Sequence, residues 1–201
     1  MDFKSKLRNP KIQQYGLEII FPIASYFFWD WTVLLIVVFY LLDYLASHVM
    51  FTRRLMTIQK YQKEKVFWIV PSSALIFLAL YGVVLWVLNN TFDKSTNSSH
   101  LVELTAFAKD ELWFLFPVIL LSYFMMDKMF FYMPRRFMNH KTKKYFFKNV
   151  VANLIATVLI VVAVFLSALF RPHDLIIIFS IIVTKLGFDF GVKKTLLKID
   201  I

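Results

Sequence analysis

The feature that most constrains the fold of this chain is a succession of long apolar segments, each about as long as a helix that crosses a bilayer. Such a helix needs about 20 predominantly apolar residues to cross about 30 Å of hydrocarbon. Of the 201 residues, 59% are hydrophobic and only 18% are charged. A chain of this length has too little interior to bury that much apolar surface. We therefore predict an integral membrane protein and exclude a soluble enzyme, a disordered chain and a secreted scaffold.

The apolar segments predict an all-α bundle of six transmembrane helices, which forms a single domain over residues 1–201. The first segment is short and contains Glu18 and Pro22, so it is the least typical of the six. The longest outer connection is expected at residues 89–110. The predicted spans are residues 14–28, 32–51, 66–88, 112–133, 148–170 and 175–192.

The basic residues predict how the bundle lies in the membrane. Eighteen of the 23 lysines and arginines fall near the two termini or in and beside the connections at 52–65 and 134–147, with only three acidic residues beside them. The other connections hold three basic and six acidic residues. Because basic loops stay in the cytoplasm, we predict a multi-pass protein of the cell inner membrane with cytoplasmic N- and C-termini.

Ionisable residues inside the predicted spans are costly and therefore mark candidate functional positions. Asp43 lies twelve residues after Trp31, and Lys185 lies eleven residues after Asp174. At about 1.5 Å per residue, both lie roughly 17 Å below the outer turns, near the middle of the bilayer. Burying opposite charges together costs less than burying either alone, so we predict an Asp43–Lys185 contact.

The other polar residues of the spans are expected at this level or in the cytoplasmic half, because apolar side chains line most of the outer half. This asymmetry predicts a polar vestibule that is open to the cytoplasm and closed on the outer side. In a purely structural alternative, Lys185 pairs with Asp189 along one helix face, and Lys128 draws Asp127 toward the headgroups. The candidate intramembrane network comprises Glu18, Asp43, His48, Asp127, Asn153, Lys185 and Asp189.

The basic connections form a second candidate site. Polybasic segments beside a span obey the orientation rule first, and they also bind anionic lipid headgroups. A cytoplasmic protein or a nucleic acid is the alternative anionic partner. The candidate patch comprises Arg53, Arg54, Arg135, Arg136, Lys143 and Lys144.

The sequence lacks the patterns of common catalytic and metal sites. It has no cysteine and only four glycines, which excludes thiolate zinc sites, cysteine nucleophiles and glycine-rich phosphate loops. No two of its four histidines lie three or four residues apart. We therefore predict no enzymatic activity, no cofactor and no metal.

Two short motifs resemble those of an uncharacterised family of prokaryotic six-span integral membrane proteins. Tyr40 and Asp43 resemble its Tyr-Trp-x-Glu motif on the second span, with Leu41 and Asp43 in place of Trp and Glu. Lys185 and Asp189 resemble the Lys-x-x-x-Asp of its last span, although Lys193 stands where that family has a histidine. The resemblance implies the six-span architecture and singles out the same residues, but it implies no activity.

These patterns predict a small bacterial inner-membrane protein that binds or conducts a ligand or ion at a cytoplasm-facing polar site. A second interpretation is a homo-oligomeric pore, or an accessory effector or regulator of a prokaryotic antiviral system, triggered through the basic face. A third is a substrate-capture subunit, since six spans in about 200 residues are similar to those of energy-coupling-factor importers, which bind ligand from the outside. A structural or regulatory membrane partner, whose ion pairs only hold the bundle together, also remains open.

Overall fold

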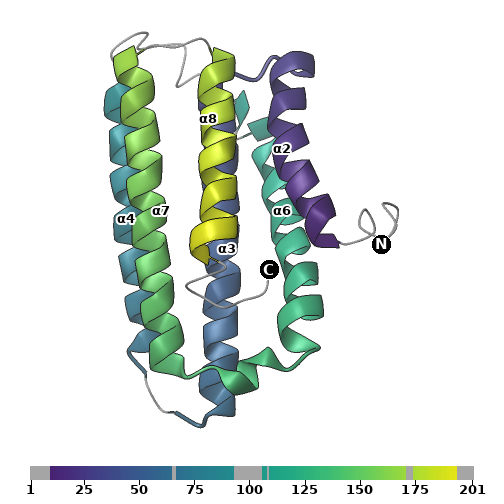
Figure 1. Cartoon of the computed structure of the whole chain (residues 1–201), viewed down its shortest axis with the longest axis vertical. Coiled ribbons are helices and arrows are strands. Elements are labelled where there is room, and N and C mark those ends of the chain that lie inside the picture. Colours follow the sequence, from purple (N-terminus) through teal and green to yellow (C-terminus); the bar gives the residue numbers. More distant parts are fainter. Residues whose placement is uncertain (1–9, 65–66, 93–105, 108, 171–173, 194–201) are drawn as a thin grey trace.

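The computed structural model describes residues 10–64, 67–92, 106–107, 109–170 and 174–193, and no strand occurs among them. Short non-α segments continue or link the main helices: a π-helix at Lys128–Tyr132, a 3-10 helix at Arg136–Asn139 and a π-helix at Phe188–Lys193. The main helices, shown in Figure 1, are α2 (Pro10–Phe28), α3 (Val33–Tyr61), α4 (Ile69–Phe92), α6 (Leu112–Asp127), α7 (Thr142–Phe170) and α8 (Asp174–Gly187).

Helix α3 is the centre of the bundle. It packs against α2, α4, α6, α7 and α8, with α4 and α7 on one side and α2 and α6 on the other (Figure 1). In its most apolar stretch 61% of the residues are buried, against 11–28% in the comparable stretches of α4, α6 and α7. The outer helices therefore expose their apolar side chains, as expected where lipid replaces water as the solvent.

Four helices are long and apolar enough to cross a membrane, namely Val33–Tyr61, Ile69–Val87, Leu112–Tyr132 and Thr142–Leu166. The apolar part of α2 is shorter and covers Glu18–Phe28. Helix α8 has 14 residues, and its π-helical continuation adds six. Exposed large side chains such as Phe67, Trp86 and Trp113 lie on the outside of the bundle. The chain thus has the helices of a membrane protein.

The helices run beyond the apolar segments that predict them. Helix α3 continues ten residues past the predicted end at residue 51, and α7 begins six residues before the predicted start at residue 148. These extra turns carry charged residues, so hydropathy falls before the helix ends. The buried Leu55 and Ile58 keep the added turns of α3 packed against Phe131 and Tyr145. Of the predicted outer loop 89–110, residues 89–92 belong to α4, and most of the remainder lies outside the described residues.

A tight turn joins α2 to α3 at the end of the bundle opposite the α3–α4 and α6–α7 connections (Figure 1). The Ser25 carbonyl accepts hydrogen bonds from the backbone N–H groups of both Trp29 and Trp31, each at 3.1 Å. Asp30 adopts a positive φ of 50°, which Asp tolerates better than most residues. Thr32 then caps α3 by accepting a hydrogen bond from the Leu35 N–H. This turn fixes the register of α2 against α3.

The opposite end is held by Gln62, which directly follows α3. Its side-chain oxygen accepts hydrogen bonds from the Thr142 backbone N–H at 3.2 Å and from the Thr142 hydroxyl at 3.0 Å. Its amide nitrogen donates to the His140 carbonyl. Because Thr142 is the first residue of α7, one side chain ties the end of α3 to the start of α7. We call the end formed by the α3–α4 and α6–α7 connections the basic end.

We expect Gln62→Ala to lower the free energy of unfolding by about 1–3 kcal/mol, because it leaves the buried start of α7 without its acceptor. Gln62→Glu should lose less, since it keeps the acceptor for Thr142. Denaturant unfolding in detergent micelles measures the difference, with the exposed Lys60→Ala as the matched control. Equal midpoints for Gln62→Ala and Lys60→Ala would contradict this role of Gln62.

Candidate functional site

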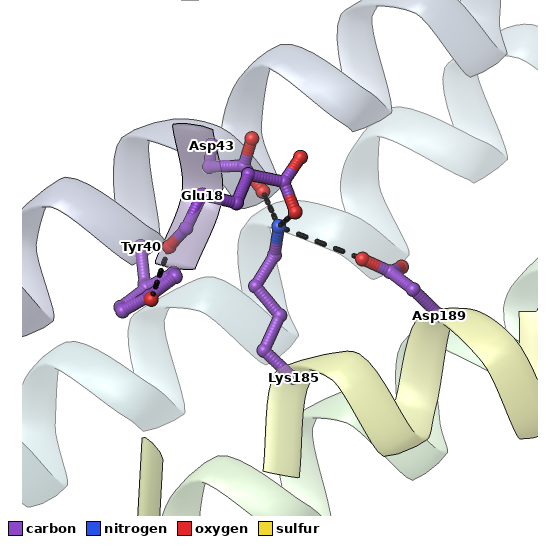
Figure 2. A network of polar contacts seen from close by, with 5 residues as sticks. All are labelled: Glu18, Tyr40, Asp43, Lys185 and Asp189. Atoms are coloured by element: carbon purple, nitrogen blue, oxygen red, sulfur yellow. Dashed lines mark hydrogen bonds and ion pairs between the residues drawn. The ribbon is translucent and has the colours of Figure 1, made fainter. Parts of the chain in front are cut away.

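Four ionisable side chains meet inside the bundle, and we call them the Lys185 cluster. The Lys185 ammonium lies 2.6 Å from Glu18 Oε2, 2.8 Å from Asp43 Oδ2 and 3.5 Å from Asp189 Oδ2. Figure 2 shows the three carboxylates converging on this nitrogen from α2, α3 and the π-helical continuation of α8. The predicted contact between Asp43 and Lys185 is therefore present, and so is the alternative pairing of Lys185 with Asp189 four residues further on.

The cluster is buried among apolar side chains. Glu18, Asp43 and Asp189 are 8%, 5% and 6% exposed. Along α3, Asp43 lies between one apolar cluster around Ile36 and Phe39 and another around Leu55 and Ile58. At such a position each charge needs a partner, because an isolated ion in an apolar interior costs far more than a paired one. The Lys185 cluster is thus a polar layer between two apolar cores.

Tyr40 organises the cluster from one turn before Asp43. Its hydroxyl donates a 2.9 Å hydrogen bond to the Glu18 backbone carbonyl, as Figure 2 shows, and so ties α3 to α2 at this level. The Lys185 ammonium also lies 5.7 Å from the centre of the Tyr40 ring, within the range of a cation–π contact. Tyr40 is therefore a structural part of the site.

The Lys185 cluster contains more acidic than basic groups, with three carboxylates around one ammonium. Carboxylates that share one ammonium in an apolar setting favour the uptake of further positive charge, either as protons or as a bound cation. The cluster is therefore suited chemically to holding a cation or exchanging protons.

Two cavities adjoin the cluster on different sides, and Asp43 lines both of them. The smaller has about 100 Å³ and lies among α3, α7 and α8, with Lys185 and Asp189 in its wall and otherwise mostly apolar lining. The larger has about 500 Å³ and lies among α2, α3 and α6, with Glu18 and Asp43 in its wall. We call the larger one the α2/α3/α6 cavity.

The α2/α3/α6 cavity extends away from the basic end. From Glu18 and Asp43 it reaches Trp29 and Trp31, at the α2–α3 turn, and Asp110, just before α6. The sequence predicted water-accessible space on the basic side of the cluster and an apolar closure on the other. The predicted closure is wrong, because α2 and α6 leave a space beside α3 on that side, which the hydropathy of single helices does not reveal.

Asp127 belongs to a separate ion pair. It is fully buried, and Arg54 Nε donates to its Oδ1 at 2.8 Å, with a second hydrogen bond from Arg54 Nη2 to the same oxygen. The alternative in which Lys128 draws Asp127 outward is not what the structure shows. Two predictions are therefore wrong: Arg54 does not belong to a surface patch, and Asp127 does not belong to the central network. Arg54 lies on the added turns of α3, which place its side chain beside Asp127 at the end of α6.

Two further members of the predicted network lie apart from the Lys185 cluster. The His48 ring stacks on Phe77, with ring centres 3.8 Å apart and an angle of 11° between the planes. Its Nε2 lies 3.5 Å from the Thr52 hydroxyl on the next turn of α3. Asn153 contributes its backbone carbonyl, which accepts a 3.3 Å hydrogen bond from the Tyr44 hydroxyl. Both residues tie α3 to its neighbours α4 and α7.

The other residues of the predicted basic patch lie at the basic end. Arg53 lies over the rings of Phe124 and Tyr132, with its guanidinium carbon 4.2 and 5.0 Å from their centres. Burial lowers the pKa of His140 in this region, and the charges of Lys148, Arg54 and Arg136 lower it further, which indicates a positive local field. Arg135, Lys143 and Lys144 are exposed, and Arg136 is half-buried.

Among the described residues, no group of three or more His, Asp or Glu side chains is arranged to hold a metal ion. In the Lys185 cluster the carboxylates are arranged around the Lys185 ammonium. The predicted basic termini and the residues 93–105 lie outside the described residues. No protein-family model, curated protein or solved structure matches this chain.

Proposed function

We propose that this chain is a six-span prokaryotic inner-membrane protein, with cytoplasmic termini, that binds a cation at the Lys185 cluster and carries it across the membrane. The cation is a proton or a larger ion. In this proposal α2, and α8 with its π-helical continuation, cross the membrane beside the four longer helices. The distribution of basic residues and the resemblance of the Tyr40–Asp43 and Lys185–Asp189 motifs to a six-span family support this topology.

The observation that carries the proposal is the meeting of three carboxylates with one ammonium at the middle of an apolar bundle. A purely structural ion pair needs one acid for one base. The additional carboxylates of Glu18 and Asp189 raise the free-energy cost of burial, and this cost is explained if they have a function in binding. Intramembrane groups of this kind mark ion and proton pathways in transporters. The two adjoining cavities give such groups space for a ligand or water.

A second candidate function is the capture of a ligand without its transport, as in the substrate-capture subunits of importers. The position of the α2/α3/α6 cavity favours it, because the cavity extends toward the end opposite the basic connections. Under the proposed orientation that end faces outward, where a capture subunit meets its ligand. Binding without flux would identify this second function.

Flux measurements in liposomes test the proposal. The purified protein is reconstituted into vesicles that contain a pH-sensitive dye, and a potential or a pH gradient is imposed in Na⁺ or K⁺ buffer. We expect proton or cation flux well above that of protein-free vesicles, and a loss of about tenfold or more in Asp43→Asn, which removes a charge at the centre of the cluster.

The matched control is Asp30→Asn. Asp30 is an exposed acid in the α2–α3 turn, and asparagine tolerates its positive φ equally well. This variant should keep the wild-type flux. A wild-type protein that folds, inserts and gives no more flux than protein-free vesicles would overturn transport. A loss in Asp30→Asn equal to that in Asp43→Asn would show that the Lys185 cluster is not the determinant.

A further inference from the structure

We propose that the α2/α3/α6 cavity binds a hydrophobic organic cation, an onium ion or protonated amine that carries bulky apolar groups. This inference rests on the proposed cation-binding function of the Lys185 cluster and names the class of ligand. It follows from three properties of the cavity that the cluster alone does not have: the charge of its lining, its aromatic side chains and its size.

The charge of the lining has one sign. Asp110 and Glu111 lie where α6 begins, and Glu18 and Asp43 lie at the level of the Lys185 cluster. No basic residue is among the described residues that line the cavity, because Lys185 lines the smaller cavity instead. A cation thus meets carboxylates at both ends of the cavity, where an anion is repelled.

The aromatic lining selects an organic cation over an inorganic one. Six of the fourteen lining residues are aromatic, and four are Leu, Val, Ile or Ser. The faces of aromatic rings attract cations, most strongly those with a weak hydration shell. Small metal cations prefer a full shell of oxygen ligands and water, whereas ten of the fourteen residues of this wall are not carboxylates and six of those ten are aromatic. The aromatic residues are Phe21, Trp29, Trp31, Phe39, Phe114 and Tyr123.

The size of the cavity fits the same class of ligand. Its volume of about 500 Å³ lies within the range of about 300–1,000 Å³ that is typical of small-molecule sites. Trp29 is 60% exposed at the α2–α3 turn, whereas Trp31 is 5% exposed and packs edge-on against Phe21 at 5.5 Å. A ligand that enters from this end therefore passes the exposed Trp29 ring. The contact between Trp31 and Phe21 holds the deeper wall in place.

Equilibrium dialysis of the detergent-purified protein tests the inference with two ions of nearly equal size and opposite charge, tetraphenylphosphonium and tetraphenylborate. Protein-free micelles give the background for each ion. We expect the protein to retain tetraphenylphosphonium above background and tetraphenylborate at background only. Equal retention of the two ions would overturn the proposal, since it would identify the cavity as a general apolar or lipid-binding space.

Two acidic residues of equal burial provide the sharpest variants. Asp43 and Asp189 both contact Lys185, but only Asp43 lines the α2/α3/α6 cavity. We expect Asp43→Asn to weaken tetraphenylphosphonium binding about tenfold or more, as the loss of a buried charge does, and Asp189→Asn to weaken it about threefold or less. Equal losses in both variants would overturn the assignment to this cavity.

A variant at the exposed turn keeps the test valid if Asp43→Asn does not fold. Trp29→Ala should weaken binding several-fold, because it removes one ring from the cavity. Trp68→Ala removes a comparably exposed tryptophan beside α4, which does not line the cavity, and should leave binding unchanged. Unchanged binding in Trp29→Ala, with wild-type binding intact, would contradict the proposed aromatic contact.

The flux assay separates this inference from the proposed function. Asp43-dependent proton or metal-ion flux without retention of tetraphenylphosphonium would overturn the ligand class and leave cation transport in place. Retention that depends on Asp43, in a protein without flux, would support the ligand class and identify the protein as a binder. If neither is observed, both proposals fail.

Discussion

Lys185→Met is expected to lower the free energy of unfolding by about 3–5 kcal/mol at neutral pH, the cost of leaving buried charges without their partner. The substitution preserves most of the apolar length of the side chain and removes the ammonium. Glu18, Asp43 and Asp189 would then face one another without the ammonium that all three contact. Denaturant unfolding in detergent micelles, followed by tryptophan fluorescence, measures the loss.

The same variant should show an unusual dependence on pH. Its folded state can relieve the repulsion only by holding protons on the clustered carboxyl groups, and the unfolded chain releases those protons at neutral pH. Because the folded state then binds more protons than the unfolded state, stability falls as pH rises. Unfolding at pH 5 and pH 8 should therefore reveal a larger deficit at pH 8 than at pH 5.

The control for this prediction is Lys128→Met, which makes the same chemical change at an exposed lysine beside α6. It should change stability by less than about 1 kcal/mol, as substitutions of exposed charges usually do. The double variant Asp43→Asn with Lys185→Met should recover part of the loss, because one of the carboxylates has become neutral. If Lys185→Met behaved like Lys128→Met, the charges of the Lys185 cluster would not be energetically coupled.

Depth along the helices predicted part of this site. Asp43 and Lys185 are counted from Trp31, just before α3, and from Asp174, the first residue of α8. Both helices begin at the same end of the bundle (Figure 1), and the two side chains meet at 2.8 Å. Glu18 lies only four residues after the predicted start of its span at residue 14, but α2 begins four residues earlier, at Pro10. Counted from Asp30 it lies twelve residues down, the same number that separates Asp43 from Trp31.

The Arg54–Asp127 pair was missed because the apolar segment that predicts α3 ends at residue 51, ten residues before the helix itself ends. Arg53 and Arg54 lower the local hydropathy, yet the helix continues to Tyr61. The signal that could have revealed this extension is the spacing of Phe51, Leu55 and Ile58 at positions i, i+4 and i+7, which is the pattern of a buried helix face. An apolar stripe on a charged helix indicates that one face is packed.

The cavity was beyond what the sequence alone predicts. Its aromatic residues come from α2, the α2–α3 turn, α3 and α6, and no spacing along the chain relates Phe21 or Trp31 to Tyr123. The space between these helices depends on how α2 and α6 pack against α3. Hydropathy places each helix in the membrane separately, whereas a cavity is a property of their packing.

Arg54→Met is the second substitution for which we expect a large loss, about 3–5 kcal/mol, and Arg53→Met beside it is the matched control. Asp127 is fully buried, and Arg54 donates two hydrogen bonds to its Oδ1. Arg53 is exposed and lies over the rings of Phe124 and Tyr132. Removing that surface cation–π contact should cost only about 0.5–1 kcal/mol.

The two arginines therefore test whether a residue at the basic end belongs to the fold or to the surface. Arg54→Met with Asp127→Leu should recover most of the loss, since a buried ion pair replaced by apolar groups is often neutral for stability. Denaturant unfolding of the three variants in micelles provides the comparison. Equal losses in Arg53→Met and Arg54→Met would return Arg54 to the basic patch. Loss confined to Arg54, with recovery in the double variant, would assign Arg54 to the fold and leave the exposed Arg53 and Arg135 in the basic patch.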